Sequence, residues 1–344
     1  MIDRTFADAA AHVADGRIPG ATLGIVSADG TRSVRVAGLA QRVPVEEPLT
    51  RDHWFDLASV SKVIATTRFV LQLAEEGRID LDRPLTDAIP DLRQYDMAGA
   101  AERRLTFRDC LLHRTFLPAV EPIYTYGDDP ARLRAFVLQR VWRQGPPVYS
   151  DINFILLGIA IERIIGAGLD ALPLGPGLSW GPPPGPTVAT EHCQWRGRVL
   201  VGEVHDENCF AMGGRTGHAG LFGTVDGVLD FALGLLDGSG ASAAMLAAIR
   251  TPVEGHRTPV EGHRTAGWEI RFPGWSGGQA CSAGTIGHTG FTGTGLWIDF
   301  ERGVAWTLLT NRVHPTRHFD SGIFELRPAT GDAVVVGFDA ESGL

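Results

Sequence analysis

The sequence has few cysteines and no strongly basic stretch. Its 344 residues carry a formal charge of −9 and include four scattered cysteines, none of them in a C-x-x-C pair. A zinc site of closely spaced cysteines is therefore not indicated, and we expect four buried, free thiols. The negative charge argues against nucleic acid or an anionic membrane surface as the main partner, because both call for a basic face.

Long hydrophobic runs and an N-terminal targeting pattern are also absent. The most apolar stretch, residues 153–165, contains Glu162 and Arg163 and is too short to span a bilayer. The first eight residues show no charged leader followed by an apolar run and a cleavage site, so we see no secretion signal. We therefore expect a cytoplasmic protein. A chain from which a signal had been removed would look the same and would be periplasmic.

The distribution of strand and helix patterns suggests the fold. With 44% apolar and 21% charged residues, the composition is that of a globular protein. Short apolar segments separated by turn residues predict strands at 21–26, 33–36, 268–272, 285–288, 295–299 and 304–310. Helical spacing of apolar residues predicts helices at 2–15, 59–76, 130–143, 151–165 and 224–236, and a short one after Thr106.

Both ends of the chain are thus strand-rich and the middle is helix-rich. This pattern predicts a mixed sheet assembled from both termini, with a helical region inserted between them. We expect a sheet domain formed by residues 1–75 and 265–344, a mostly helical domain formed by residues 76–264, and an active site between the two domains.

Three segments resist assignment to regular structure. Residues 172–186 are dense in glycine and proline and predict a surface loop. The heptapeptide TPVEGHR at residues 251–257 is repeated at 258–264, which we interpret as a tandem duplication in an exposed loop. The tail, residues 327–344, contains Pro328 and Gly331 and has no assignment from periodicity.

A first candidate for chemistry lies in residues 55–64, with the sequence FDLASVSKVI. Ser59 and Lys62 are three residues apart, so on a helix beginning near Ser59 both side chains share a face. Burial disfavours an ammonium, so Lys62 could be neutral enough to take a proton from Ser59. Backbone N–H groups at the helix start could stabilise a negative oxygen. The alternative is an ordinary helix in which this spacing has no function.

Two further stretches supply polar groups. Tyr149 precedes Ser150, Asp151 and a predicted helix, and near a lysine ammonium the ionised form of a tyrosine is favoured and can act as a base. The sequence GHTGFTGTG at residues 287–295 alternates small residues, which lets a strand's backbone lie close to a ligand. The alternatives are a packed tyrosine ring with an exposed hydroxyl, and a glycine-rich strand edge. A phosphate loop is not indicated, because no Lys-Ser/Thr follows the glycines.

The order and spacing of these motifs resemble the serine β-lactamase and penicillin-binding-protein superfamily. The class C-like branch, with D-Ala-D-Ala carboxypeptidases, family VIII carboxylesterases and acyltransferases, is the most similar. The likeness runs from about residue 18 to residue 312 and includes the stretches VHDEN at 204–208 and GHAGLF at 217–222. It implies an α/β (α+β) fold of the β-lactamase/transpeptidase type, in which helices flank an antiparallel sheet and an all-helical region is inserted.

The resemblance also implies roles for the motif residues. Ser59 would attack the carbonyl and become acylated, and Lys62 and Tyr149 would share the proton transfers. The backbone N–H groups of Ser59 and Phe291 would form the oxyanion hole. The implied oxyanion and substrate-binding residues are Phe291, His288, Thr289, Gly290 and Asp151.

Two positions and one segment depart from the pattern of the relatives. His288 replaces a lysine and would orient the substrate or help Tyr149. Asp151 stands where many lactamases have an asparagine that holds the substrate amide, and a carboxylate there would disfavour a nearby substrate carboxylate. Both departures argue against strong β-lactamase activity. Residues 111–117 also lack the usual Ser-Gly pair.

Four polar residues that could be mistaken for metal ligands are interpreted as structural hydrogen bonders, because acyl-enzyme chemistry needs no metal. They are His205, Asp206, Asn208 and His218. We expect no metal and no cofactor.

The sequence therefore predicts a serine hydrolase that forms an acyl-enzyme at Ser59, a carboxylesterase or amidase acting on a small-molecule ester or amide. The alternatives are a β-lactamase or D-Ala-D-Ala carboxypeptidase, an acyltransferase, and an inactive ligand-binding module. The complete set of Ser59, Lys62 and Tyr149 argues against the last. The expected partner is a small ester, amide or lactam rather than nucleic acid or a membrane. The oligomeric state does not follow from the sequence.

Overall fold

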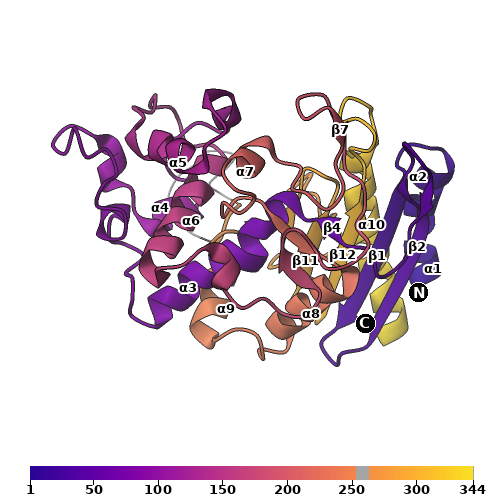
Figure 1. The fold of residues 1–344 in the computed structure, drawn as a ribbon. Helices are drawn as coiled ribbons and strands as arrows, with labels where there is room; N and C mark the ends of the chain where they lie inside the picture. The colour runs from indigo at the N-terminus through magenta and orange to yellow at the C-terminus, as the bar shows by residue number, and fades with distance from the viewer. Residues whose placement is uncertain (253–262, 344) are drawn as a thin grey trace.

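The structure, a computed structural model, describes residues 1–252 and 263–343 (Figure 1). Its largest sheet has seven strands in the order β3-β2-β1-β12-β11-β10-β9. The strands span Gly20–Ser27 (β1), Arg32–Gln41 (β2), Glu47–Pro48 (β3), Glu269–Ile270 (β9), Ile286–Thr289 (β10), Gly295–Asp299 (β11) and Val304–Thr310 (β12).

Strands from the two ends of the chain pair in the middle of this sheet. β1 lies against β12, with Ala21 opposite Thr310 and Ser27 opposite Val304. The sheet therefore draws on both termini, and the α/β (α+β) fold with an antiparallel sheet flanked by helices is confirmed. The expectation of a mixed sheet is wrong, because all its described strand pairs are antiparallel. Hairpins connect β1 to β2 and β10 through β11 to β12, and a hairpin reverses the chain direction.

Helices cover both faces of the sheet. Alternate residues of β12 join two different hydrophobic clusters, because successive side chains of a strand point to opposite faces. Ala305 and Leu309 pack with α8 (Val225–Leu236), whereas Trp306 and Leu308 pack with α10 (Ile323–Ser342). The short N-terminal helices α1 (Ile2–Thr5) and α2 (Ala7–Ala14) lie beside α10. This two-sided burial explains why β12 is apolar along its whole length.

The other described helices belong to the middle of the chain. They span Arg68–Glu75 (α3), Phe107–Leu111 (α4), Pro130–Gln139 (α5), Asp151–Ile165 (α6), Glu207–Ala211 (α7) and Ala243–Arg250 (α9). Several predicted helix ends are confirmed: Thr106 caps α4, Thr224 caps α8, and Gly166, at φ +71°, ends α6. α5 ends earlier than predicted, because the backbone is already extended at Arg140.

A second sheet leads directly into the Ser59 segment. Its strands β4 (Phe55–Asp56), β8 (Leu221–Gly223) and β5 (Leu178–Trp180) lie in the order β4-β8-β5. The prediction of a loop at 172–186 is therefore wrong for β5. Its partner β8 is distant in sequence, so no local sequence pattern predicts the pairing. A two-stranded sheet of β6 (His192–Cys193) and β7 (Arg198–Val199) completes the described strands.

The structure describes the C-terminal tail but not most of the repeated heptapeptide. The tail forms most of α10, which contains Pro328, because its buried face packs on the sheet through residues such as Val334 and Val335. Most of the repeat lies outside the described residues, since 253–262 are not described. The division into domains 1–75 with 265–344 and 76–264 stays a prediction.

Two expectations drawn from composition can be compared with the structure. All four cysteines are buried and free, as predicted. In the described part of the chain, every helix falls short of the length or the apolar character that crossing a bilayer requires.

The side chain of Asn311 clamps three strands at the end of the large sheet. Its Oδ1 accepts a hydrogen bond from the Gly20 N–H at 2.9 Å, and its Nδ2 donates to the Leu39 and Ala40 carbonyls at 3.2 and 3.1 Å. Asn311→Leu leaves these buried groups unpaired, so we expect the free energy of unfolding to fall by about 2–4 kcal/mol. Denaturation in urea measures this change. Unaltered stability would show that the clamp is dispensable.

Candidate active site

Ser59 lies in a tight turn that follows β4. The buried carboxylate of Asp56 holds this turn by accepting hydrogen bonds from the Ala58 N–H at 2.8 Å and the His205 N–H at 2.6 Å. Ala58 has φ +46°, a conformation that costs a non-glycine residue about 1–2 kcal/mol. The strained turn lifts Ser59 into partial exposure between buried neighbours. A 3-10 turn at Ala58–Val60 and a π-helical segment at Lys62–Thr67 thus replace the predicted regular start of the helix.

Lys62 is fully buried directly beneath Ser59. Its Nζ donates hydrogen bonds to Ser59 Oγ at 2.9 Å and to the His218 carbonyl at 3.0 Å, and it forms an ion pair with Asp151 Oδ1 at 2.8 Å. The predicted proximity of Ser59 and Lys62 is present. Lys62 is also the only lysine in the chain, and every other permanently cationic side chain is an arginine.

The charge state of this group differs from the sequence expectation. Burial lowers the pKa of Lys62, but the Asp151 carboxylate and Tyr149 outweigh burial, and the net pKa lies above its usual value. Burial also raises the pKa of Tyr149, and Asp151 adds to the rise that Lys62 opposes. The predictions of a neutral Lys62 and a readily ionised Tyr149 are therefore wrong. These pKa directions favour a protonated Lys62 and a neutral Tyr149 hydroxyl in the resting site.

Tyr149 sits within a ring of polar and cationic side chains. Its ring centroid lies 4.5 Å from that of His113 and 5.9 Å from that of His288, and 5.0 Å from Arg264 Cζ. Lys62 Nζ lies 5.1 Å from the same centroid. The Tyr149 hydroxyl interacts with Lys62 and Ser59. Among the described residues, three other buried polar atoms in this ring have no hydrogen-bonding partner: His113 Nε2, His288 Nε2 and Arg264 Nη1. A polar substrate can satisfy such groups.

The hydrogen bonds of the two histidines decide their tautomers. His113 Nδ1 accepts from the Ser150 N–H at 3.0 Å, which leaves its proton on Nε2. His288 Nδ1 donates to the Thr289 carbonyl at 2.9 Å, which leaves Nε2 as an acceptor. Burial, together with the cations of Arg264 and Lys62, holds the pKa of each histidine well below its usual value. His288 therefore offers a neutral acceptor where many relatives have a lysine cation.

The glycine-rich loop after β10 packs on the segment that precedes Ser59. Thr292 Oγ1 donates to the Asp56 carbonyl at 2.7 Å, and Thr294 Oγ1 donates to the Leu57 carbonyl at 3.0 Å. A Cβ on Gly290 would collide with Thr294 Oγ1 and lie 2.5 Å from the Leu57 carbonyl oxygen. Glycine at 290 is thus required by contact with this segment of the chain rather than by approach to a ligand alone.

Phe291 is the exposed residue of this loop. Its side chain is 48% exposed, and its ring lies under two guanidinium groups, 4.7 Å from Arg312 Cζ and 5.4 Å from Arg317 Cζ. Arg317 in turn forms ion pairs with Glu191 and Glu207. The exposed ring is therefore held against the Arg312 and Arg317 side chains.

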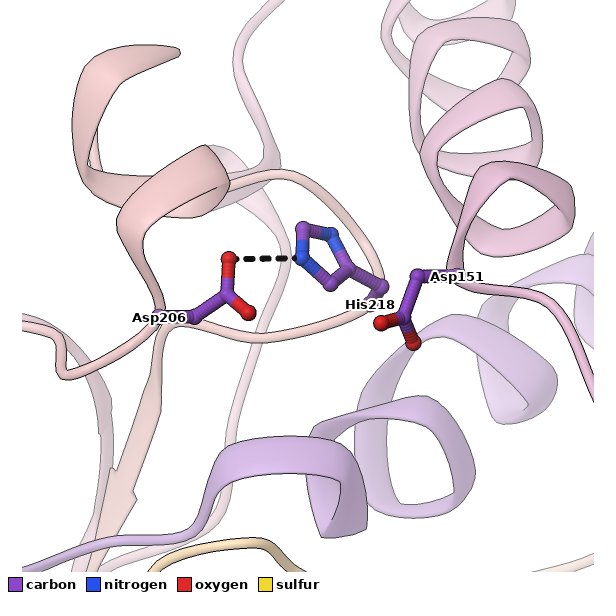
Figure 2. A group of neighbouring side chains, drawn as sticks. All are labelled: Asp151, Asp206 and His218. Atoms are coloured by element: carbon purple, nitrogen blue, oxygen red, sulfur yellow. Dashed lines mark hydrogen bonds and ion pairs between the residues drawn. The ribbon is translucent and has the colours of Figure 1, made fainter. Parts of the chain in front are cut away.

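Asp206 and His218 support the site from beneath. Figure 2 shows Asp206 hydrogen-bonded to His218, with Asp151 projecting nearby from α6. His218 Nε2 lies 2.9 Å from Asp206 Oδ1, and its Nδ1 lies 2.8 Å from Thr216 Oγ1. Burial raises the pKa of Asp206, but His218 and the Cys209 N–H outweigh burial and lower it.

This cluster is poorly suited to a metal ion, although ligand atoms of Asp151, Asp206 and His218 lie within 4.8 Å of one another. Both imidazole nitrogens are already engaged, and the Lys62 ammonium lies 2.8 Å from Asp151. A cation would have to displace that ammonium. We therefore retain the interpretation of Asp206 and His218 as structural hydrogen bonders, which place the His218 carbonyl that Lys62 contacts.

Comparison with known proteins identifies the family. A family model described as beta-lactamase matches residues 2–329. The chain belongs to the β-lactamase family. A relative from Salmonella agona named "Putative D-alanyl-D-alanine carboxypeptidase" is 29% identical over 310 residues, covering 77% of this chain and 71% of the relative.

Two solved structures share the β-lactamase fold of this chain. EstCE1, described as a hydrolase with promiscuous acyltransferase activity, has a TM-score of 0.74 at 19% identity and covers 97% of this chain and 98% of its own. A beta-lactamase from Sulfitobacter sp. EE-36 has a TM-score of 0.73 at 21% identity and covers 99% of this chain and 98% of its own. At these identities the likeness shows the fold alone.

The sequence reasoning missed two residues of this β-lactamase-family site. His113 lies in the segment 111–117, where the missing Ser-Gly pair was the only signal. Arg264 ends the second copy of the repeated heptapeptide, yet it is only 6% exposed. Its role depends on the contact with Tyr149, which no spacing in the sequence could reveal.

The ion pair between Lys62 and Asp151 generates a testable pH dependence. Lys62 can accept a proton only when it is neutral, so activity should rise as the pH passes the pKa of Lys62. Asp151 raises that pKa and therefore keeps this rise, the acid limb of the activity profile, at high pH. Asp151→Asn removes that carboxylate, and we expect the pKa of Lys62 to fall by about 1–3 units. The acid limb of kcat/KM for an ester should move to lower pH by the same amount.

The chain's single lysine makes this shift directly measurable. Protein labelled with ¹³Cε-lysine gives one side-chain NMR signal, whose titration reports the pKa of Lys62. Asp170→Asn is the control, because Asp170 forms a surface ion pair with Arg215 at 2.9 Å. An Asp151→Asn titration midpoint equal to that of the control would refute this role of Asp151.

Proposed function

We propose that this chain hydrolyses a small-molecule ester or amide through an acyl-enzyme at Ser59. The hydrogen bond between Lys62 Nζ and Ser59 Oγ, at 2.9 Å, carries the proposal. A buried lysine in contact with a partly exposed serine is an arrangement that can activate a nucleophile. The ion pair with Asp151 at 2.8 Å raises the pKa of Lys62 and so sets the pH at which this lysine becomes a base.

The acylation step can be written with its protons balanced. The step begins with Lys62 as a neutral amine, the form whose appearance sets the acid limb of the pH profile. Ser59 Oγ then attacks the substrate carbonyl and gives its proton to Lys62, while the Ser59 and Phe291 N–H groups bind the oxyanion. As the intermediate collapses, the Tyr149 hydroxyl protonates the leaving alcohol or amine and recovers a proton from Lys62.

Deacylation repeats the same chemistry with water as the nucleophile. The water gives one proton to Lys62 and attacks the acyl carbonyl, and the Ser59 oxygen leaves with a proton returned by Lys62. The products are the free acid and the original Ser59 hydroxyl. An alcohol in place of water would give acyl transfer, so an acyltransferase activity differs from hydrolysis only in the acceptor.

The charges around Ser59 support esters or amides ahead of β-lactams. A β-lactam carries a carboxylate, and relatives that hydrolyse it have a lysine and an asparagine amide at two positions. Here His288 is a neutral acceptor, and Asp151 lacks the amide donors. Both differences remove stabilisation from an anionic substrate.

A D-Ala-D-Ala carboxypeptidase is a second candidate, favoured by Arg264. Its buried guanidinium lies beside Tyr149, with Nη2 bonded to Glu269 at 3.1 Å and Nη1 free of a hydrogen-bonding partner among the described residues. A peptide's terminal carboxylate could occupy Nη1. The name of the relative from Salmonella agona points in the same direction.

Turnover of two acyl donors tests the proposed reaction. We expect hydrolysis of p-nitrophenyl butyrate, slow hydrolysis of nitrocefin, and loss of ester hydrolysis in Ser59→Ala. Lys62→Ala should reduce turnover about 10²–10⁴-fold, because it removes the general base. A fluorophosphonate should label Ser59, as located by mass spectrometry. Full activity in Ser59→Ala or a label elsewhere would contradict the mechanism, and rapid nitrocefin turnover would favour a β-lactamase.

Arg264→Met separates the two candidate substrate classes. If Arg264 binds a carboxylate, the variant should lose about 10–100-fold more kcat/KM for an acylated D-Ala-D-Ala peptide than for p-nitrophenyl butyrate, since a hydrogen bond between charged groups is lost only with the peptide. Arg250→Met is the control, because Arg250 is exposed on α9. Equal losses for both substrates would remove the support for the peptidase.

A further inference from the structure

Arg327, on α10, brings a buried positive charge to the glycine-rich loop. The residue is 5% exposed, and no carboxylate in residues 1–252 or 263–343 forms an ion pair with it. Its Nη2 donates to the Gly290 carbonyl at 2.7 Å and to the Thr294 carbonyl at 2.8 Å. Burial lowers the pKa of Arg327 to about 9, which leaves the guanidinium charged at neutral pH.

Burying this cation is expensive for the fold. An ion removed from water costs several kcal/mol unless partners compensate it. Here the hydrogen-bonding partners are two neutral carbonyls, and Glu269 adds only a charge interaction without a hydrogen bond. An apolar side chain of similar size would fill the same space without that cost. The buried charge therefore points to a role beyond packing.

The two carbonyls that Arg327 contacts close the loop around Phe291. The Gly290 N–H donates to the Thr294 carbonyl at 2.8 Å, and the Gly293 N–H donates to the Gly290 carbonyl at 3.1 Å. One guanidinium thus holds both ends of a tight turn. The threonine hydroxyls described above hold the same turn against Asp56 and Leu57, so the loop is clamped from two sides.

The Gly290 carbonyl and the Phe291 N–H belong to one peptide unit. A donor that bonds the carbonyl draws electron density toward oxygen and makes the N–H of that unit a stronger donor. The proposed oxyanion donor at Phe291 is therefore polarised by Arg327. The Ser59 N–H shares its peptide unit with the Ala58 carbonyl, which accepts a hydrogen bond from the Ser61 N–H. The helical turn therefore polarises the Ser59 N–H, the other proposed oxyanion donor, in the same way.

We infer that Arg327 is a positioning residue that fixes and polarises the Phe291 N–H as an oxyanion donor. This inference rests on the proposed acyl-enzyme function. Negative charge on the substrate oxygen develops in the transition state and is absent from the bound substrate. Arg327 should therefore affect kcat much more than KM.

Steady-state kinetics of Arg327→Met and Arg327→Lys test the inference. With p-nitrophenyl butyrate we expect Arg327→Met to lower kcat about 10²-fold, as a displaced donor does, with KM changed less than about threefold. Arg327→Lys keeps the charge and one donor, so it should recover part of the loss. A trifluoromethyl ketone forms a tetrahedral oxyanion adduct with serine, and its Ki should weaken in proportion to kcat/KM. The Ki of the product butyrate should stay constant.

Arg302→Met is the matched control for a loosened α10. Arg302 joins Asp339 of α10 to the turn between β11 and β12 at 2.9 and 3.2 Å, and it makes no described contact with the 290–294 loop. Equal kcat losses in the Arg327→Met and Arg302→Met variants would overturn the inference, as would a wild-type kcat in Arg327→Met. If Arg327→Met does not fold, Arg327→Lys alone tests the inference. A lower kcat together with a proportionally weaker Ki of the ketone in Arg327→Lys would then support it, and a wild-type kcat would overturn it.

Fluorophosphonate labelling of the wild type distinguishes failure of the inference from failure of the proposed function. Absence of a label on Ser59 overturns both. A wild-type enzyme labelled at Ser59, with Arg327→Met and Arg327→Lys labelled at the same rate, overturns the role of Arg327 alone. Slower labelling of the Arg327 variants, with the Arg302 control unchanged, supports it.

Discussion

The buried ion pair between Lys62 and Asp151 determines the charge state of the whole site. Burial by itself lowers the pKa of a lysine, because the ammonium loses its hydration. The carboxylate at 2.8 Å reverses that tendency, and the pKa of Lys62 rises instead. The neutral state of Tyr149 and the neutral state of His288 then follow, because burial disfavours any further charge beside this pair.

The surrounding structure is built to hold that pair in place. Asp151 starts α6, where a carboxylate interacts favourably with the helix N-terminus. The His218 carbonyl approaches Lys62 because Gly217, at φ +77°, lets its loop lie against α6, where a Cβ would collide with the Phe154 carbonyl. Asp206 fixes the His218 ring, and Thr66 Oγ1 donates to the Gly217 carbonyl at 2.6 Å. Several distant segments thus converge on one ammonium group.

Much of the architecture could be predicted because its signals are local. Gly166 ends α6 and Thr224 begins α8 through hydrogen bonds and backbone angles that involve only neighbouring residues. The strand β5 and the helix α10 could not be found in this way. The strand exists through its pairing with β8, and the helix exists, despite Pro328, through burial against the sheet.

The sequence by itself determined the fold family, the spacing that brings Ser59 to Lys62, and the order of the motifs around them. These features depend on short-range geometry, which a pattern of residue types records. Only the tertiary structure decided the charges: Asp151 as the partner of Lys62, His288 as a neutral acceptor, and Arg264 and Arg327 as buried cations near the site. Protonation depends on burial and on charges a few ångströms away, and residues far apart along the chain supply both.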